Sequence, residues 1–209
     1  MTAGVIAVAT VAHVPTLARA EITPDFQHTL VEGEHRLGEE LRALKPDLWV
    51  IASTHWVSTF NWFATCQTVH EGVCVADEAP DLVPGIPYRY RGDPEFAGKL
   101  VAEWKRGAIP AERNETPHYS WDYGTFVPLS HLDPKAEVAV VGVPSVLMAN
   151  LDECLRAGAG RARRCRCPSS VRIRRTSRHA TRRRPRRALR RSRAWSRARG
   201  HPFRPQLPG

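Results

Sequence analysis

The chain has 209 residues, enough for one sizeable domain with its own core, and a formal net charge of +10. No stretch approaches the roughly 20 apolar residues of a membrane-spanning helix, and residues 1–10 do not resemble a secretory signal, so we expect neither. The five cysteines are odd in number and irregularly spaced, which disfavours a disulfide framework and favours a reduced, cytoplasmic setting.

The positive charge is confined to the end of the chain. Residues 161–209 contain 19 arginines and no lysine, aspartate or glutamate. Removing these 19 from the 31 basic residues leaves 12 in the first 160 residues, against all 21 acidic residues, for a net charge of −9. The sequence therefore predicts an α/β domain over residues 1–158 and an arginine-rich tail over residues 159–209, kept disordered by like-charge repulsion and low apolar content.

The first predicted element is a buried strand in AGVIAVATVAHVP that ends near Val11, with His13 just beyond it. A helix is predicted next, with Thr23 as the capping residue, Pro24 at the first helical position and apolar residues at helical intervals as far as Leu44. The following segment, KPDLWVIASTHW, predicts another buried strand. Strand, helix, strand is typical of a sheet with parallel neighbours.

The rest of the domain continues this pattern. Residues 80–94, rich in proline and glycine, predict a long loop, and a helix is predicted to begin at Asp93 with Pro94 behind it. EVAVVGVPSV, residues 137–146, predicts a third strand, and ANLDECLRAG begins another helix. We therefore predict the α/β class, with a central sheet of parallel strands flanked by helices.

His13 and His55 share one predicted position, directly after the carboxyl end of a buried strand. If the two strands are neighbours, both imidazoles converge on the sheet edge at which α/β folds bind ligands. Two imidazoles and one carboxylate form the facial site of non-haem Fe(II) oxygenases, and zinc can use a similar set, so spacing does not choose the metal. A single histidine after a strand is more often a hydrogen-bonding loop residue than a metal ligand. We expect this ordinary role for His70 in a solvated turn and for His118 in a loop.

Four segments, AHVPTL, VIASTHW, PYRYRGDPEFAGKL and WDYGTFVPLSHL, occur in the order and at the intervals found in class III extradiol catechol dioxygenases, the LigB-type superfamily. The chain resembles this family from about Val5 to about Gly158, and within it most resembles the 3,4-dihydroxyphenylacetate 2,3-dioxygenases. The resemblance implies that His13 and His55 are ligands of Fe(II). It also implies O2-dependent opening of a catechol ring beside its diol, and assembly as a homo-oligomer.

Tyr123 lies in WDYGTFVPL, where some relatives have a histidine that serves in acid–base chemistry. The resemblance therefore implies that Tyr123 hydrogen-bonds the bound diol or oxygen, although a packing role fits the sequence equally well. A substrate carboxylate would require a nearby cation, for which Arg89 and Arg91 are candidates; a surface role fits both equally well. The substrate-binding residues are otherwise unassigned.

The resemblance ends where the arginine-rich tail begins. In the family, the carboxylate ligand and the main catalytic histidine come from the second half of a longer chain, whereas no aspartate or glutamate follows Glu153 here. We therefore expect no carboxylate ligand in this chain, weak iron binding, poor solubility and little turnover, and we interpret the tail as an out-of-frame translation. Two alternatives are a tail that binds nucleic acid or other polyanions without sequence preference, and a non-oxygenase relative that binds zinc or no metal.

Overall fold

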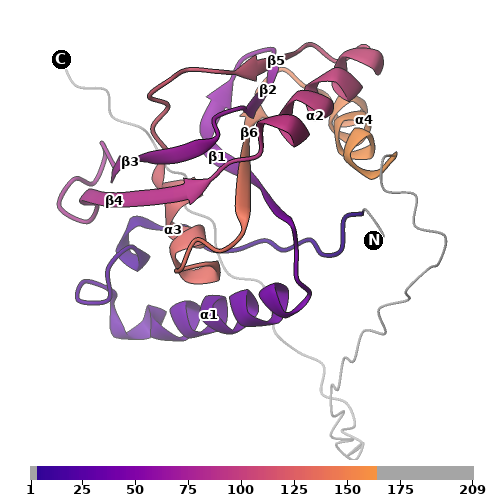
Figure 1. The fold of residues 1–209 in the computed structure, drawn as a ribbon. Coiled ribbons are helices and arrows are strands. Elements are labelled where there is room, and N and C mark those ends of the chain that lie inside the picture. Colours follow the sequence, from indigo (N-terminus) through magenta and orange to yellow (C-terminus); the bar gives the residue numbers. More distant parts are fainter. Residues whose placement is uncertain (1–3, 164–209) are drawn as a thin grey trace, which may run out of the picture. The chain divides into compact units, whose positions relative to one another are not determined.

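The computed structural model describes residues 4–163, which fold into an α/β arrangement of short sheets and covering helices (Figure 1). In chain order the elements are the 3-10 turns η1 (Pro15–Leu17) and η2 (Asp25–Gln27), α1 (His28–Ala43), β1 (Leu48–Ser58), β2 (Trp62–Thr65), β3 (Val69–Val75), β4 (Pro84–Arg91), α2 (Pro94–Arg106), β5 (Ala111–Asn114), α3 (Tyr123–Leu132), β6 (Ala139–Val146) and α4 (Leu151–Arg163). The predicted α/β class with parallel strand pairs is confirmed. The tail beyond Arg163 lies outside the described residues.

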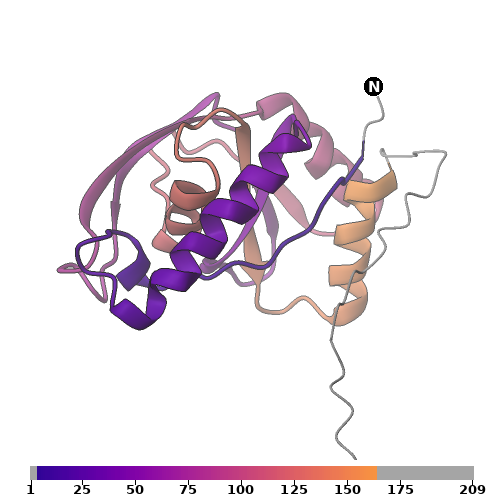
Figure 2. The same cartoon turned by 90° about the horizontal axis from the view of Figure 1, so that it is seen from below.

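The strands form three pairs. β1 pairs with β6 and β2 pairs with β5, both in parallel, whereas β3 and β4 form an antiparallel hairpin. β6 is buried along most of its length, as the continuous apolar sequence AVVGVPSV predicts for a parallel strand covered on both faces. α3 lies between the β1–β6 pair and α1, as the two views agree (Figures 1 and 2).

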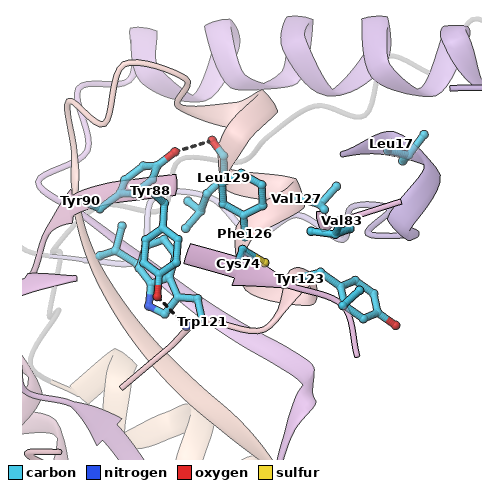
Figure 3. Packing of buried hydrophobic residues seen from close by; sticks show 12 residues of the cluster. Leu17, Cys74, Val83, Tyr88, Tyr90, Trp121, Tyr123, Phe126, Val127 and Leu129 are labelled. Atoms are coloured by element: carbon cyan, nitrogen blue, oxygen red, sulfur yellow. Dashed lines mark hydrogen bonds between the residues drawn. The ribbon is translucent and has the colours of Figure 1, made fainter. Parts of the chain in front are cut away.

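Two groups of buried side chains make the core, and β6 contributes to both. Val140 belongs to the group under α3 and the β3–β4 hairpin, while Val141 and Val143 belong to the group under α2 and α4. Successive strand residues point to opposite faces, so one strand serves two cores. In the first group the rings of Tyr88 and Trp121 stack with centroids 4.7 Å apart (Figure 3).

The second predicted helix and the third predicted strand are confirmed. α2 begins at Pro94, and the Asp93 side chain accepts a hydrogen bond from the Phe96 backbone N–H at 2.8 Å, which caps the helix. β6 lies within the predicted range 137–146. α4 runs to Arg163, five residues past the predicted domain end at residue 158.

The predicted first strand is wrong. Residues 5–14 are extended but belong to no sheet among the described residues, and Val5 and Val8 are 57% and 89% exposed. β-branched residues favour a strand only where a neighbouring strand accepts and donates backbone hydrogen bonds, and no described strand lies in register with this segment. The expected strand–helix–strand unit therefore lacks its first strand.

Two other local predictions are also wrong. Residues 84–91 of the predicted loop form β4 instead, with Tyr88 and Tyr90 turned into the core. Thr23 does not cap the helix: its hydroxyl donates to the backbone oxygens of Thr16 and Arg19, and a 3-10 turn at residues 25–27 precedes α1. The local backbone acceptors compete successfully for the threonine hydroxyl.

Candidate functional site

The side chains of His13, His55 and Tyr123 lie together, although they are more than 100 residues apart at the extremes. The ring centroids of the two histidines are 5.1 Å apart, and the Tyr123 ring is 4.1 Å from His55 and 6.3 Å from His13. His55 is exposed, His13 is half-buried and Tyr123 is 8% exposed. The structure thus brings the two imidazoles together, as predicted. The pair lies open to solvent on the side of His55.

His55 occupies an irregular stretch of β1. Regular pairing with β6 stops at Ala52, opposite Val143, and resumes at Val57, opposite Ser145, so residues 53–56 face Pro144 alone. Proline has no backbone N–H to donate, which is one physical reason for the ladder to break there. β1 continues to Ser58. His55 therefore lies within a bulge of the strand, whereas the sequence predicted a position beyond the strand end.

Ser53 organises this bulge. Its Oγ accepts hydrogen bonds from the backbone N–H groups of His55 at 3.1 Å and Trp56 at 3.4 Å, in place of the missing strand partner. The same hydroxyl donates to Asp122 Oδ1 at 2.6 Å, and Asp122 also caps α3 by accepting from the Thr125 N–H at 3.0 Å. One short network therefore fixes both the His55 backbone and the start of the helix that carries Tyr123.

Gly124 allows α3 to approach His55 closely. A Cβ atom at this position would lie 2.7 Å from His55 Cδ2 and 2.9 Å from Ser53 Oγ, closer than side chains pack. Tyr123, the preceding residue, therefore begins α3 directly against the imidazole. Figure 3 shows its phenol pointing away from the other core side chains.

Burial raises the pKa of Tyr123 to about 12, and the neighbouring carboxylate of Glu78 adds to this rise. The phenol is therefore protonated throughout the physiological range. Interaction with the Tyr123 hydroxyl is the main cause that lowers the pKa of Glu78, and attraction to His55 adds a smaller part. Tyr123 thus has a charged partner on one side and an imidazole on the other.

His13 follows the extended segment that precedes η1. Its Nε2 is 3.3 Å from Thr54 Oγ1, which ties it to the residue before His55. Behind it, the Glu34 side chain of α1 is 5% exposed and lies against the Ala12 backbone N–H, without a hydrogen bond of normal geometry to either carboxylate oxygen. Burial raises the pKa of Glu34 to about 7, and the Ala12 N–H partly offsets this.

Several other predicted positions lie elsewhere. The solvated turn expected for His70 is wrong: this side chain is 1% exposed in β3, its Nε2–H donates to the Val140 carbonyl at 3.0 Å, and burial lowers its pKa. His70 therefore links β3 to β6 inside the core and is not a surface residue. His118 lies in a loop, as predicted, and its side chain is exposed. Arg89 and Arg91 are exposed on β4, where Arg89 pairs with Glu71 at 3.1 Å.

Sequence reasoning missed Glu78 as a residue of this site. It lies at the tip of the β3–β4 hairpin, within a region that the sequence presented as a loop. The predicted loop gave no indication of which acidic residue would face the histidines. Recognising the alternation of apolar and charged residues in PYRYR as a strand would have identified the hairpin.

Two imidazoles together with a carboxylate oxygen are donors that suit a divalent metal of the first transition row. Within residues 4–163, no three histidine, cysteine, aspartate or glutamate side chains already surround one point closely enough to hold an ion. The cysteines of this range, Cys66, Cys74 and Cys154, are unpaired. No helix in this part of the chain is long and apolar enough to cross a membrane.

Comparison with known proteins gives a match to one family and distant similarities to solved structures, among them the following two. Residues 7–162 match the family described as the catalytic LigB subunit of aromatic ring-opening dioxygenase. The uncharacterized protein JW3007 from Escherichia coli K12 is 22% identical with a TM-score of 0.40, over 56% of this chain and 40% of that one, so this chain spans less than half of that protein's length. Pyrrolidone carboxyl peptidase from Pyrococcus furiosus is 11% identical with a TM-score of 0.36, over 61% of this chain and 65% of the other.

Proposed function

Since the chain belongs to the family of the catalytic LigB subunit of aromatic ring-opening dioxygenases, we propose that its site binds Fe(II) and opens the ring of a catechol with O2. The cleavage is extradiol, beside the two hydroxyl groups, and the substrate class is that of 3,4-dihydroxyphenylacetate. The observation that carries the proposal is the pair of imidazoles 5.1 Å apart, open to solvent, with a protonated phenol against one of them.

His13 and His55 would hold the metal through their ring nitrogens. Bound iron supplies a Lewis acid and a common binding point for the catechol oxygens and dioxygen. The protein contributes orientation, because the Ser53 network fixes the His55 backbone and Thr54 contacts His13. Orientation of this kind supplies much of the rate of a reaction between two bound partners.

Tyr123 would act on the catechol itself. Its hydroxyl donates toward Glu78, which leaves the oxygen lone pairs able to accept a hydrogen bond from a substrate hydroxyl. An accepting oxygen at this position orients the diol and eases the loss of a catechol proton. The buried face of the Tyr123 ring keeps the hydroxyl in place between substrate and Glu78.

Residues 161–209 contain 19 arginines and no aspartate or glutamate. We propose that turnover by this chain is correspondingly low, and that the tail results from a shifted reading frame. Sequencing the coding DNA across codons 151–167 tests the second point. A frame that continues with a buried strand, a serine–histidine pair and a later glutamate would support it, and the absence of one would overturn it.

The test of the proposed function separates metal binding from turnover. Anaerobic Fe(II) titration should show a site that His13→Ala and His55→Ala each abolish, and that the matched control His118→Ala, an exposed loop histidine, leaves intact. Tyr123→Phe should keep the iron and lower the formation of yellow semialdehyde from 3,4-dihydroxyphenylacetate by about 10²- to 10⁴-fold, the usual contribution of acid–base catalysis. Equal iron binding by all four variants would refute the proposal.

A second function is favoured by the charge of the tail alone. Nineteen arginines without a carboxylate in residues 161–209 would neutralise phosphates, so we propose non-specific polyanion binding as the alternative. Affinity for a mixed-sequence RNA should fall steeply with salt, because each phosphate contact releases a counterion. A salt-independent affinity would refute this alternative without touching the dioxygenase proposal.

A further inference from the structure

One face of α4 is held against the second core. The Trp62 indole N–H donates to the Glu153 carboxylate at 2.7 Å. The Trp104 indole N–H donates to the Ala157 carbonyl at 3.0 Å, and Ala157 is 1% exposed. Residues four apart lie on the same side of a helix, so Glu153 and Ala157 define the inner face of α4, which lies beside α2 (Figure 1).

The outer face of α4 is uncharged and exposed. It is formed by residues at the i, i+3, i+4 and i+7 positions of the helix, namely Leu151, Cys154, Leu155 and Gly158. Leu151 and Leu155 are 75% and 64% exposed, so nothing in the described part of the chain covers them. Asp152 and Arg156 lie at one edge of this face and pair with each other at 2.9 Å.

The apolar surface continues from α4 onto a neighbouring turn. The Leu147 N–H donates to the Ser58 carbonyl at 2.9 Å, and the next N–H, that of Met148, donates to the Thr59 carbonyl at 3.0 Å. The loop before α4 therefore lies against the turn between β1 and β2, which carries Phe60. Five large apolar side chains, each between 64% and 75% exposed, form what we call the α4 patch: Phe60, Leu147, Met148, Leu151 and Leu155. Exposed apolar surface gathered in this way is typical of a binding surface.

The sequence that follows this patch is strongly basic. Residues 161–166 contain four arginines, and residues 161–209 contain 19 arginines and no acidic residue, whereas the first 160 residues carry a net charge of −9. A nucleic acid would satisfy the arginines but offers no hydrocarbon to the exposed leucines. A second copy of the chain would cover the leucines but bring two arginine-rich segments of like charge into one assembly. An anionic lipid bilayer offers both phosphates and hydrocarbon.

We propose that the α4 patch and the arginines that follow it bind the surface of an anionic lipid bilayer. The apolar side chains of the patch enter the boundary between headgroups and acyl chains, so α4 lies on the membrane and does not cross it. The arginines contact lipid phosphates. The two parts act together, because a short apolar surface binds lipid weakly unless a polybasic segment adds to it. This inference is independent of the dioxygenase proposal.

The test measures co-sedimentation of the full chain with vesicles of phosphatidylcholine alone and of phosphatidylcholine mixed with anionic phosphatidylglycerol. The double variant Leu151→Ser, Leu155→Ser removes the apolar face of α4 without changing the charge. The matched control is Leu30→Ser, Leu44→Ser at α1, whose leucines are 46% and 54% exposed. Phe60→Ser alters the patch outside α4, and circular dichroism confirms that each variant is folded.

We expect the wild type to bind the anionic vesicles and the α4 double variant to bind them at least about tenfold more weakly, since two leucine side chains no longer leave water. Phe60→Ser should weaken binding in the same direction, and the α1 control should bind as the wild type does. Wild-type binding by both patch variants would overturn the inference, because the arginines alone would then suffice. Dimerisation of the wild type without lipid that the α4 double variant abolishes would also overturn it, since the patch would then belong to a second copy.

Discussion

Replacing Gly124 with alanine tests whether the close approach of α3 to β1 shapes the site. The new Cβ would lie 2.7 Å from His55 Cδ2 and 2.9 Å from both Ser53 Oγ and Asp122 Oδ1, so these groups must move. Overpacking of this kind costs about 1–3 kcal/mol, and the better helix propensity of alanine returns up to about 1 kcal/mol. We expect a net loss of roughly 1–2 kcal/mol in the free energy of unfolding.

The control is Gly33→Ala in α1, where an added Cβ meets nothing within 4 Å. This substitution should stabilise the protein by about 0.5–1 kcal/mol, because glycine is a poor helix residue. The two variants therefore differ in sign, and urea denaturation followed by circular dichroism measures both. Because His55 must also be displaced in Gly124→Ala, Fe(II) binding in the anaerobic titration should weaken in that variant alone. Equal stability and equal metal affinity in the two variants would refute the packing argument.

Three further predictions concern groups that hold the site and its core. Ser53→Ala leaves two backbone N–H groups without their acceptor and removes one of the hydrogen bonds to the Asp122 carboxylate, so the free energy of unfolding should fall by about 1–3 kcal/mol, measured by urea denaturation. No loss would contradict the role of Ser53 in the bulge. Glu34 has a folded-state pKa of about 7, raised from an ordinary value of 4.5, so its contribution to stability is complete below about pH 4 and is lost as the pH rises through 7. Glu34→Gln should abolish this part of the pH dependence, worth about 3 kcal/mol. A stability profile equal to that of the wild type would refute the assignment. Burial lowers the pKa of His70, so its contribution has the opposite sign and stability is lost as the pH falls below the unfolded value near 6.5; His70→Gln should reduce that acid sensitivity, and an unchanged acid limb of the stability profile would contradict it.

The sequence predicts those parts of the fold in which local signals and long-range packing agree. Asp93 followed by Pro94 marks the start of α2, and the apolar run of residues 139–146 forms β6. The segment at residues 5–11 carries an equally strong strand signal but has no described neighbour to pair with. Strand formation depends on that neighbour, which a single segment does not reveal.

The sequence likewise identifies some residues of the candidate site and misses others. His13, His55 and Tyr123 could be identified from motifs, and the structure brings them together. Glu78 could not be identified in this way, because its position at the hairpin tip depends on the β3–β4 pairing. The bulge at His55 likewise depends on Pro144, a residue almost 90 positions away in the sequence.

Because β6 contributes side chains to both cores, neither core can be completed during synthesis before this strand has been made. Both cores need this strand, since Val140 closes one and Val141 and Val143 close the other. At about 5–20 residues per second, the ribosome takes roughly 4–15 s to proceed from the start of β2 at Trp62 to β6 at Ala139. Until β6 is made, Trp62, and Trp104 once it has been synthesised, lack the side chains of Val141 and Val143 that belong to the same core. The nascent chain therefore leaves these apolar side chains uncovered until β6 emerges.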